Sequence, residues 1–187
     1  MKQFLGIVFV GLSLAACSPE FRAQQAERYA KDMFPTAYGE KSFFSSNGYS
    51  DRDIDDNSVD ISYRVNAATS RERHLNLMLY HAALLAQERG KEEFLLTDVK
   101  RWVVCKVGDY GAFMRATAKF DGRLPGSGNW LQVSEVTAAF GAEASTPTED
   151  FEMRQRILLS YIESCASRRI VEQEDVVISS EEPGTQR

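Results

Sequence analysis

The segment from Thr69 to Arg89 is predicted to form a helix with an unusually wide apolar side. Thr69-Ser70-Arg71-Glu72 matches a capping box at its start, and Gly90 supplies the residue that ends it. On a helical wheel, apolar side chains cover more than half of the circumference, and Asn76, Tyr80 and Gln87 mark a narrow polar side. Such a helix must be covered on more than one face. We therefore expect a sheet on one face and another element, or a partner, elsewhere.

Strand patterns lie on both sides of this helix. Residues 57–65 alternate between apolar and polar side chains, which is the period of a half-buried strand. Residues 94–107 are rich in β-branched and aromatic side chains, and residues 112–120 and 130–140 are also predicted to be strands. Residues 148–165 fit a second helix. The expected fold class is α+β, with an antiparallel-rich sheet of about four strands packed against the long helix at 69–89 and with a C-terminal helix.

The N-terminus has the pattern of an export signal. Lys2 precedes an apolar run from Phe4 to Ala16, which is too short for a bilayer span of about 20 residues but suits the core of a signal peptide. The run ends in Leu14-Ala15-Ala16-Cys17, which resembles a lipobox. We expect residues 1–16 to be a lipoprotein signal peptide and Cys17 to carry diacylglycerol and fatty acids such as palmitate. The alternatives are an uncleaved anchor helix and an ordinary signal beside a chance cysteine.

The remaining chain is predicted to divide into a tether, one domain and a tail. Residues 17–46 are expected to be a lipid-anchored, partly helical tether, residues 47–167 a globular α+β domain, and residues 168–187 a flexible acidic tail. Ser18, where aspartate would favour the inner membrane, indicates an outer-membrane lipoprotein facing the periplasm. The net charge of −5 repels nucleic acids, so no nucleic-acid partner is expected.

Two further cysteines, Cys105 and Cys165, can pair once the chain is outside the cytoplasm. One interpretation is a disulfide that closes a long loop, and the other is two separate buried thiols. The chain has no Cys-x-x-Cys motif, so a redox enzyme is not indicated.

Residues 48–96 resemble a family of small Gram-negative bacterial lipoproteins of unknown function. The matching elements are Gly48-Tyr49-Ser50, Thr69-Ser70-Arg71, the helical stretch Leu79-Tyr80-His81-Ala82-Ala83-Leu84-Leu85, Gly90 and Phe94. The chain departs from the pattern at His81, Leu84 and Lys91, where the family usually has arginine, glutamate and an aromatic residue. The resemblance implies an exported, lipid-anchored α+β domain, and it implies no activity.

A soft-metal site is one hypothesis for the long helix. His74 and His81 lie on one face with Met78 between them, and imidazole and thioether ligands suit Cu(I). The favoured interpretation is that these residues are buried at the boundary with the sheet.

The acidic residues Asp51, Asp53, Asp55 and Asp56 resemble the start of a calcium-binding loop. An EF-hand needs glycine at its sixth position and glutamate at its twelfth, and this chain has Asp56 and Ser62 there. A solvated acidic turn is therefore favoured over a calcium site.

Aromatic side chains gather before the first predicted strand, at Phe34, Tyr38, Phe43, Phe44 and Tyr49. Exposed aromatic residues often anchor protein interfaces, so these are candidate partner-binding residues. The favoured alternative is that they fold back and cover the apolar helix.

No catalytic motif is recognisable, so we expect a protein that is not an enzyme and has no cofactor. The expected function is a lipid-anchored periplasmic domain that binds another envelope protein or has a structural role, held to the membrane by its N-terminal lipid. The alternatives are a periplasmic hydrolase or copper-handling protein, which would use His74 or His81, and a purely structural lipoprotein without a fixed partner.

Overall fold

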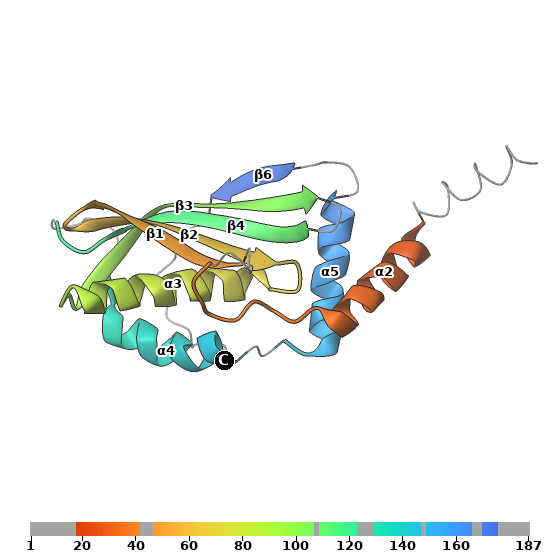
Figure 1. Cartoon of the computed structure of the whole chain (residues 1–187), viewed down its shortest axis with the longest axis horizontal. Helices are drawn as coiled ribbons and strands as arrows, with labels where there is room; N and C mark the ends of the chain where they lie inside the picture. Colours follow the sequence, from red (N-terminus) through yellow and green to blue (C-terminus); the bar gives the residue numbers. More distant parts are fainter. Residues whose placement is uncertain are drawn as a thin grey trace, which may run out of the picture.

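The computed structural model is an α+β fold with one antiparallel sheet, helices along one side of it and helices at one end of it (Figure 1). It describes residues 18–41, 47–106, 109–122, 129–146, 149–165 and 170–175. The elements are α2 (Pro19–Asp32), β1 (Gly48–Asp55), β2 (Ser58–Asn66), α3 (Arg71–Glu88), β3 (Glu93–Lys106), β4 (Asp109–Lys119), β5 (Leu131–Gln132), α4 (Val133–Ser145), α5 (Phe151–Cys165) and β6 (Ile170–Asp175).

The sheet has the order β1-β2-β4-β3-β5, and β6 pairs with β3 outside this order. Every pairing is antiparallel. The strands at 58–66 and 93–106, which α3 connects, are therefore parallel to each other but not adjacent, because β4 lies between them. The predicted α+β class is confirmed. The count of about four strands was too low because β1 and β6 were not recognised.

The ends of α3 are set by local hydrogen bonds. Ser70 is the N-cap, since its side chain accepts a hydrogen bond from the backbone N–H of Arg73, at 3.0 Å. The capping box that was predicted to start at Thr69 is therefore wrong by one residue. At the other end, Gly90 has φ +65° and its N–H donates to the carbonyl of Gln87, while the N–H of Lys91 donates to the carbonyl of Ala86. This is a Schellman motif, and the predicted end of the helix at Gly90 is confirmed.

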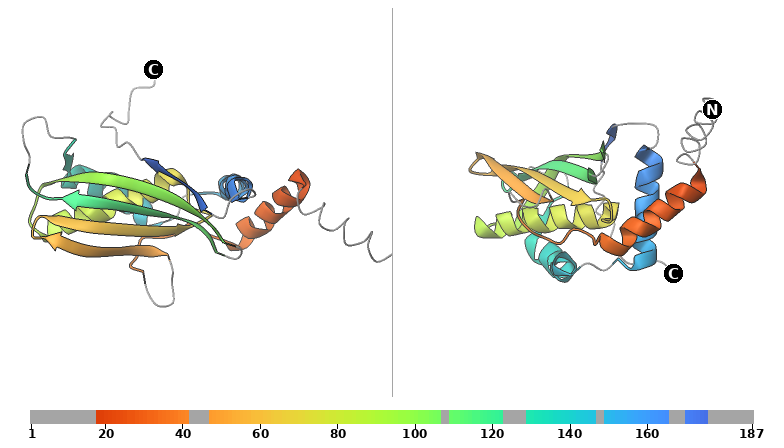
Figure 2. Two further views of the ribbon diagram at one scale, coloured as in Figure 1. Left: turned by 90° about the horizontal axis from the view of Figure 1, so that it is seen from above. Right: turned by 45° about the vertical axis from the view of Figure 1, so that its right-hand side comes forward.

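Helix α3 is covered by the sheet on one side and by α4 on another, which explains its wide apolar side (Figures 1 and 2). Residues 130–140 were predicted to be a strand, and this prediction is wrong beyond Gln132, where α4 begins. The buried residues Val133, Val136 and Ala144 recur at helical spacing, so one face of α4 packs inward. The β-branched residues in this stretch concealed that period.

The two terminal segments pack on the domain. Ala26 and Ala30 of α2 are fully buried, and α2 packs against α5. The described part of the predicted tether is thus partly helical, as expected, but it is docked. Residues 170–175 of the predicted tail form β6 and pair with β3, so that part of the tail prediction is wrong. The acidic composition predicted a frayed tail, but the backbone of these residues forms hydrogen bonds with the free edge of β3, and this stabilises the strand.

Cys105 and Cys165 form a disulfide with a Cα–Cα distance of 5.3 Å, which joins the end of β3 to the end of α5 across 60 positions. We predict that replacing both cysteines with alanine lowers the free energy of unfolding by about 2–4 kcal/mol, because the unfolded chain loses a long loop constraint. Urea unfolding of the oxidised protein and the double variant measures this loss. A reductant should destabilise the oxidised protein and leave the double variant unchanged; equal midpoints for both proteins would contradict the prediction.

Candidate functional site

A cavity of about 520 Å³ lies where the start of α3, the end of α4 and the start of α5 meet. Its volume is within the range of small-ligand sites. The residues that line it are Ser70, Glu72, Arg73, Glu143, Glu149, Asp150 and Met153. Four carboxylates therefore surround one guanidinium, which makes the cavity a region of negative charge.

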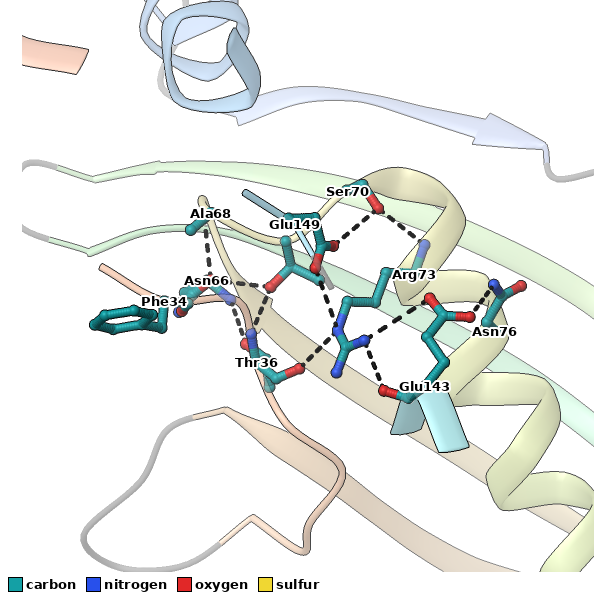
Figure 3. Close-up of polar contacts among 10 residues, drawn as sticks. Phe34, Thr36, Asn66, Ala68, Ser70, Arg73, Asn76, Glu143 and Glu149 are labelled. Atoms are coloured by element: carbon teal, nitrogen blue, oxygen red, sulfur yellow. Dashed lines mark hydrogen bonds and ion pairs between the residues drawn. The ribbon is translucent and has the colours of Figure 1, made fainter. Parts of the chain in front are cut away.

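Arg73 is the centre of this site, with only 1% of its side chain exposed. Its Nε donates a hydrogen bond to the carbonyl of Thr36 at 3.1 Å, and its Nη1 donates to the carbonyl of Glu143 at 2.8 Å (Figure 3). The guanidinium thus connects α3 to the segment after α2 and to α4. A buried arginine with carbonyl acceptors is a strong structural clamp, because its planar fork holds several donors in fixed directions.

Two carboxylates approach the same guanidinium from different sides (Figure 3). Glu143 Oε1 lies 3.7 Å from Arg73 Nη1, and Glu149 Oε2 lies 4.0 Å from Arg73 Nε. Each carboxylate also accepts a hydrogen bond on its other oxygen, from Asn76 Nδ2 at 3.1 Å and from Ser70 Oγ at 3.3 Å. The charge of Arg73 is therefore shared between two acids, and the other carboxylates of the cavity add to the negative charge.

Two buried atoms of this cluster have no hydrogen-bond partner: Arg73 Nη2 and Glu149 Oε2. The Glu149 side chain is only 7% exposed. Leaving a buried donor or acceptor unpaired costs about 1–3 kcal/mol, and more for a charged group. The Arg73–Glu149 pair is therefore closed off from solvent and carries one unpaired donor and one unpaired acceptor, which lowers its net contribution to stability.

The segment from Phe34 to Tyr38 is positioned by short polar contacts. The backbone N–H of Thr36 donates to Thr69 Oγ1 at 2.8 Å, and the backbone N–H of Asn66 donates to Thr36 Oγ1 at 3.0 Å. Asn66 Nδ2 donates to the carbonyl of Phe34 at 2.6 Å. These bonds hold the Thr36 carbonyl where Arg73 can reach it.

The predicted aromatic cluster divides into two groups. Tyr38 and Tyr49 fold back onto α3, and the Tyr49 ring stacks on His81 with a centroid distance of 3.8 Å. Phe34 remains 62% exposed, with the Arg154 guanidinium 4.6 Å from its ring centroid. Phe43 and Phe44 lie outside the described residues. The described tyrosines therefore cover the helix, and Phe34 alone of the described members is largely exposed.

The histidines of the hypothetical copper site are buried among protein partners. His74 donates from Nε2 to the carbonyl of Tyr63 at 3.1 Å. His81 contacts the Tyr38 hydroxyl through Nδ1 and Asp51 Oδ2 through Nε2, each at 2.9 Å. Burial lowers the pKa of both histidines, and that of His74 falls to about 3. Met78 is also fully buried.

Tyr38 is the outer member of the chain Tyr38–His81–Asp51. Burial, followed by the nearby Tyr49, raises the pKa of Tyr38 well above its usual range. The Tyr38 hydroxyl therefore stays protonated and donates to His81 Nδ1, which leaves Nε2–H of the neutral imidazole to donate to Asp51. These two hydrogen bonds join both the segment after α2 and strand β1 to α3.

The acidic residues of the calcium-like pattern have separate partners. Asp51 contacts His81, Asp53 pairs with Arg89, and Asp55 Oδ1 accepts the N–H of Asn57 at 2.9 Å. Asp51, Asp53 and Asp55 lie in β1, so the predicted solvated turn is wrong for most of its length. Within the described ranges, no group of three His, Cys, Asp or Glu residues is placed to hold a metal ion.

Arg73, Glu143 and Glu149 were not identified from the sequence. Arg73 lies three positions before Asn76, so a wheel could have placed it on the same polar stripe. Glu143 lies between the predicted strand at 130–140 and the predicted helix at 148–165, and Glu149 lies at the start of that helix, so no spacing along the chain related them to Arg73. Tertiary packing brings them together: α4 carries Glu143 against α3, and Glu149 follows in the connection to α5.

The predicted signal peptide at 1–16 and the predicted lipidation residue Cys17 lie outside the described residues. Among the helices that the structure does describe, none has the length and apolar character needed to cross a membrane. Comparisons with models of protein families, with curated proteins and with solved structures found no match for this chain.

Proposed function

We propose that the protein is a lipoprotein, anchored through acylated Cys17 to the outer membrane on its periplasmic side, that binds another envelope protein and catalyses no reaction. The resemblance of residues 48–96 to small lipoproteins supports the same proposal. A lipid anchor confines a binding domain to one surface and so raises its effective concentration toward a partner there.

The observation that carries this proposal is the position of α2. Ser18, the residue after Cys17, is the N-cap of α2, and its side chain accepts the N–H of Phe21 at 3.2 Å. Ala26 and Ala30 then pack this helix firmly on the domain. An acyl group on Cys17 would consequently be joined to the body by a docked helix. Such an attachment sets the orientation of the domain at the membrane, which suits a protein that presents a binding surface.

The surroundings of the histidines support a binding role over catalysis. A general base needs an accessible nitrogen and a pKa near the working pH. His74 is 0% exposed and His81 is 3% exposed, and both have lowered pKa values. In contrast, Phe34 and the rim of the cavity at Met153 are exposed apolar surface, as is common where proteins bind each other.

We predict that Cys17→Ala abolishes acylation and moves the protein out of the membrane fraction. Mass analysis of the N-terminal peptide and separation of inner and outer membranes measure both effects. A cross-linker attached at position 34 should then capture a defined partner from intact envelopes only for the acylated protein. Attachment at Ile54, which is 55% exposed but lies on β1, is the matched control and should not capture that partner. An unacylated native N-terminus would refute the lipoprotein assignment.

A further inference from the structure

We propose that the open face of the sheet lies against the membrane and contacts anionic lipid headgroups there. The open face is formed by the side chains of β1, β2, β3 and β4 that point away from α3. This inference rests on the proposed function, because it names the surface that the docked lipid anchor would hold at the bilayer.

Alternation along the strands identifies the side chains of the open face. Ile61 and Tyr63 of β2 are buried on the side of α3, so their neighbours on the strand point to the other side. Residues directly opposite each other in an antiparallel ladder share a face. The ladder therefore places Arg64, Phe113 and Trp102 in one row across the open face. In the view from above, no helix of the described part of the chain covers the strands on this side (Figure 2).

An aromatic pair and three cations lie together on the open face. The rings of Trp102 and Phe113 have a centroid distance of 5.4 Å, and both residues are half-buried. Arg64 is opposite Phe113 in the same row, and Lys100 and Arg115 are opposite each other in the next row. Tryptophan and phenylalanine beside arginine and lysine are typical of protein surfaces that lie at the level of lipid headgroups. We call these five residues the basic-aromatic cluster.

The cluster is positively charged although the whole chain has a net charge of −5. Its two rows contain no acidic residue on β1 to β4, and the nearest acids are Asp60, which pairs with both Arg52 and Arg115, and Asp175 of β6, the register partner of Lys100. The other described acidic residues of this face and its bulge lie farther along the strands, at Asp55, Glu93 and Asp98. Positive charge therefore remains beside the aromatic pair, and it complements an anionic surface.

The position of α2 favours a bilayer over a soluble anion. This helix rises from the level of α4 to the level of the strands, so its first turn lies beside one end of the sheet (Figure 1). Cys17 directly precedes Ser18, the N-cap of α2, and an acyl group on Cys17 would therefore start near the plane of the open face. Phe21 in the first turn is 44% exposed and adds apolar surface beside the anchor.

This orientation leaves the proposed partner-binding side accessible. The segment after α2, at 33–41, lies on the side of the sheet that α3 and α4 occupy (Figure 1). That segment includes Phe34, whose exposed ring is the proposed point of contact with the partner. A domain with its open sheet face on the membrane therefore presents Phe34 away from the lipid.

The test measures binding of the full mature chain from residue 17 to vesicles, with Cys17→Ser so that no acyl group contributes. The vesicles contain phosphatidylcholine alone, or equal parts of phosphatidylcholine and phosphatidylglycerol, and sedimentation measures the bound fraction. We expect at least about tenfold tighter binding to the anionic vesicles, because each cation near such a surface contributes about fivefold. Raising the salt concentration should weaken this binding.

Two double variants with the same net charge locate the contact. Lys100→Gln with Arg115→Gln removes two exposed cations from the cluster and should weaken binding to anionic vesicles by about 25-fold. Lys31→Gln with Arg156→Gln removes two exposed cations from the last turn of α2 and from α5, and it is the matched control. In each pair one cation forms an ion pair in the folded protein. The control should change binding by less than about threefold, since charges beyond the screening length from the bilayer contribute little.

The two tryptophans of the chain give a second measurement, which does not depend on charge. Trp102 belongs to the cluster, whereas Trp130 precedes β5, which pairs with the start of β3. Vesicles whose acyl chains carry bromine quench tryptophan fluorescence on contact. The Trp130→Phe protein, which retains Trp102, should lose more fluorescence on these vesicles than the Trp102→Phe protein, which retains Trp130.

Absent binding to anionic vesicles, equal binding to both vesicles, equal effects of the two double variants, or stronger quenching of Trp130 than of Trp102 would overturn the inference. Binding to a soluble oligonucleotide or to polyglutamate as tight as that to anionic vesicles would also overturn it, because a soluble polyanion would then be the better ligand.

The failure of this inference and the failure of the proposed function are distinguishable. The outcomes above leave the acylation of Cys17 and capture at position 34 untouched, so the proposed function would survive them. Conversely, vesicle binding through the cluster by a chain whose native Cys17 is found unacylated would retain the membrane-facing sheet and remove the lipoprotein proposal.

Discussion

Replacing Arg73 with methionine is expected to lower the free energy of unfolding by about 3–5 kcal/mol. The variant leaves Glu143 and Glu149 without the cation that both approach, and it removes the donors to the Thr36 and Glu143 carbonyls. Methionine is close enough in length to fill the space, so the loss reports the charge and its hydrogen bonds more than a cavity. Urea unfolding of both proteins at pH 7 measures the difference.

Arg156→Met, at an exposed position on α5, is the control and should change stability by less than about 1 kcal/mol. The stability of Arg73→Lys should lie between those of Arg73→Met and Arg156→Met, because lysine keeps the charge but lacks the planar guanidinium that donates to both carbonyls. Adding Glu149→Gln to Arg73→Met should recover part of the loss, since one unpaired carboxylate is then removed. An Arg73→Met protein as stable as the Arg156→Met protein would show that the buried cluster has no net stabilising role.

Lowering the pH from 7 to 3 is expected to remove about 4–5 kcal/mol of stability through His74 alone. Its pKa falls from 6.5 to about 3 in the folded protein, mainly through burial and next through the charge of Arg101. Nε2–H is already bonded to the Tyr63 carbonyl, and a proton on Nδ1 would find no acceptor. Below pH 6.5 His74 therefore binds a proton in the unfolded chain but not in the folded protein. The free energy of unfolding decreases as the pH is lowered, until the pKa of the folded state is reached.

The measurement is cleanest between pH 6.5 and 5, above the range where most carboxylates titrate. There we expect the loss from His74 in urea unfolding to steepen as the pH falls, reaching about 1.4 kcal/mol per pH unit near pH 5. His74→Gln should be less stable at pH 7 but should lose most of this slope. His81→Gln is the matched variant: its pKa is also lowered by burial, although Asp51 opposes the shift, so it should remove a smaller part of the slope. A wild-type stability that is flat across this window would exclude a buried neutral His74.

The elements with strong local signals were predictable from the sequence. The period of two in residues 59–65 identified β2, and the helical wheel and Gly90 identified α3, because the apolar period and the capping hydrogen bonds are both local properties. The wide apolar side of α3 also indicated correctly that something besides the sheet covers it. Its N-cap was misplaced by one residue because Thr69 and Ser70 are both good capping residues. The Thr69 hydroxyl is used elsewhere, since it donates to Asn66 Oδ1 and accepts the backbone N–H of Thr36.

Elements whose conformation depends on distant partners were not predictable. Residues 133–145 are rich in both alanine and β-branched residues, and contact with α3 selects the helix. Residues 170–175 are acidic, yet pairing with β3 makes them a strand. The docking of α2 depends on two small residues, Ala26 and Ala30, that have no distinctive pattern of their own.

The amino-acid sequence by itself determined the class of the fold, the long helix with its Schellman end, and the pattern of a signal followed by a lipobox cysteine. Each of these depends on residues within a few positions of one another. Only the tertiary structure decided the order of the strands, the burial of both histidines and the cavity around Arg73. The residues that line that cavity are spread along the sequence from Ser70 to Met153. Packing between helices brings such distant residues together, and a local pattern in the sequence does not predict that packing.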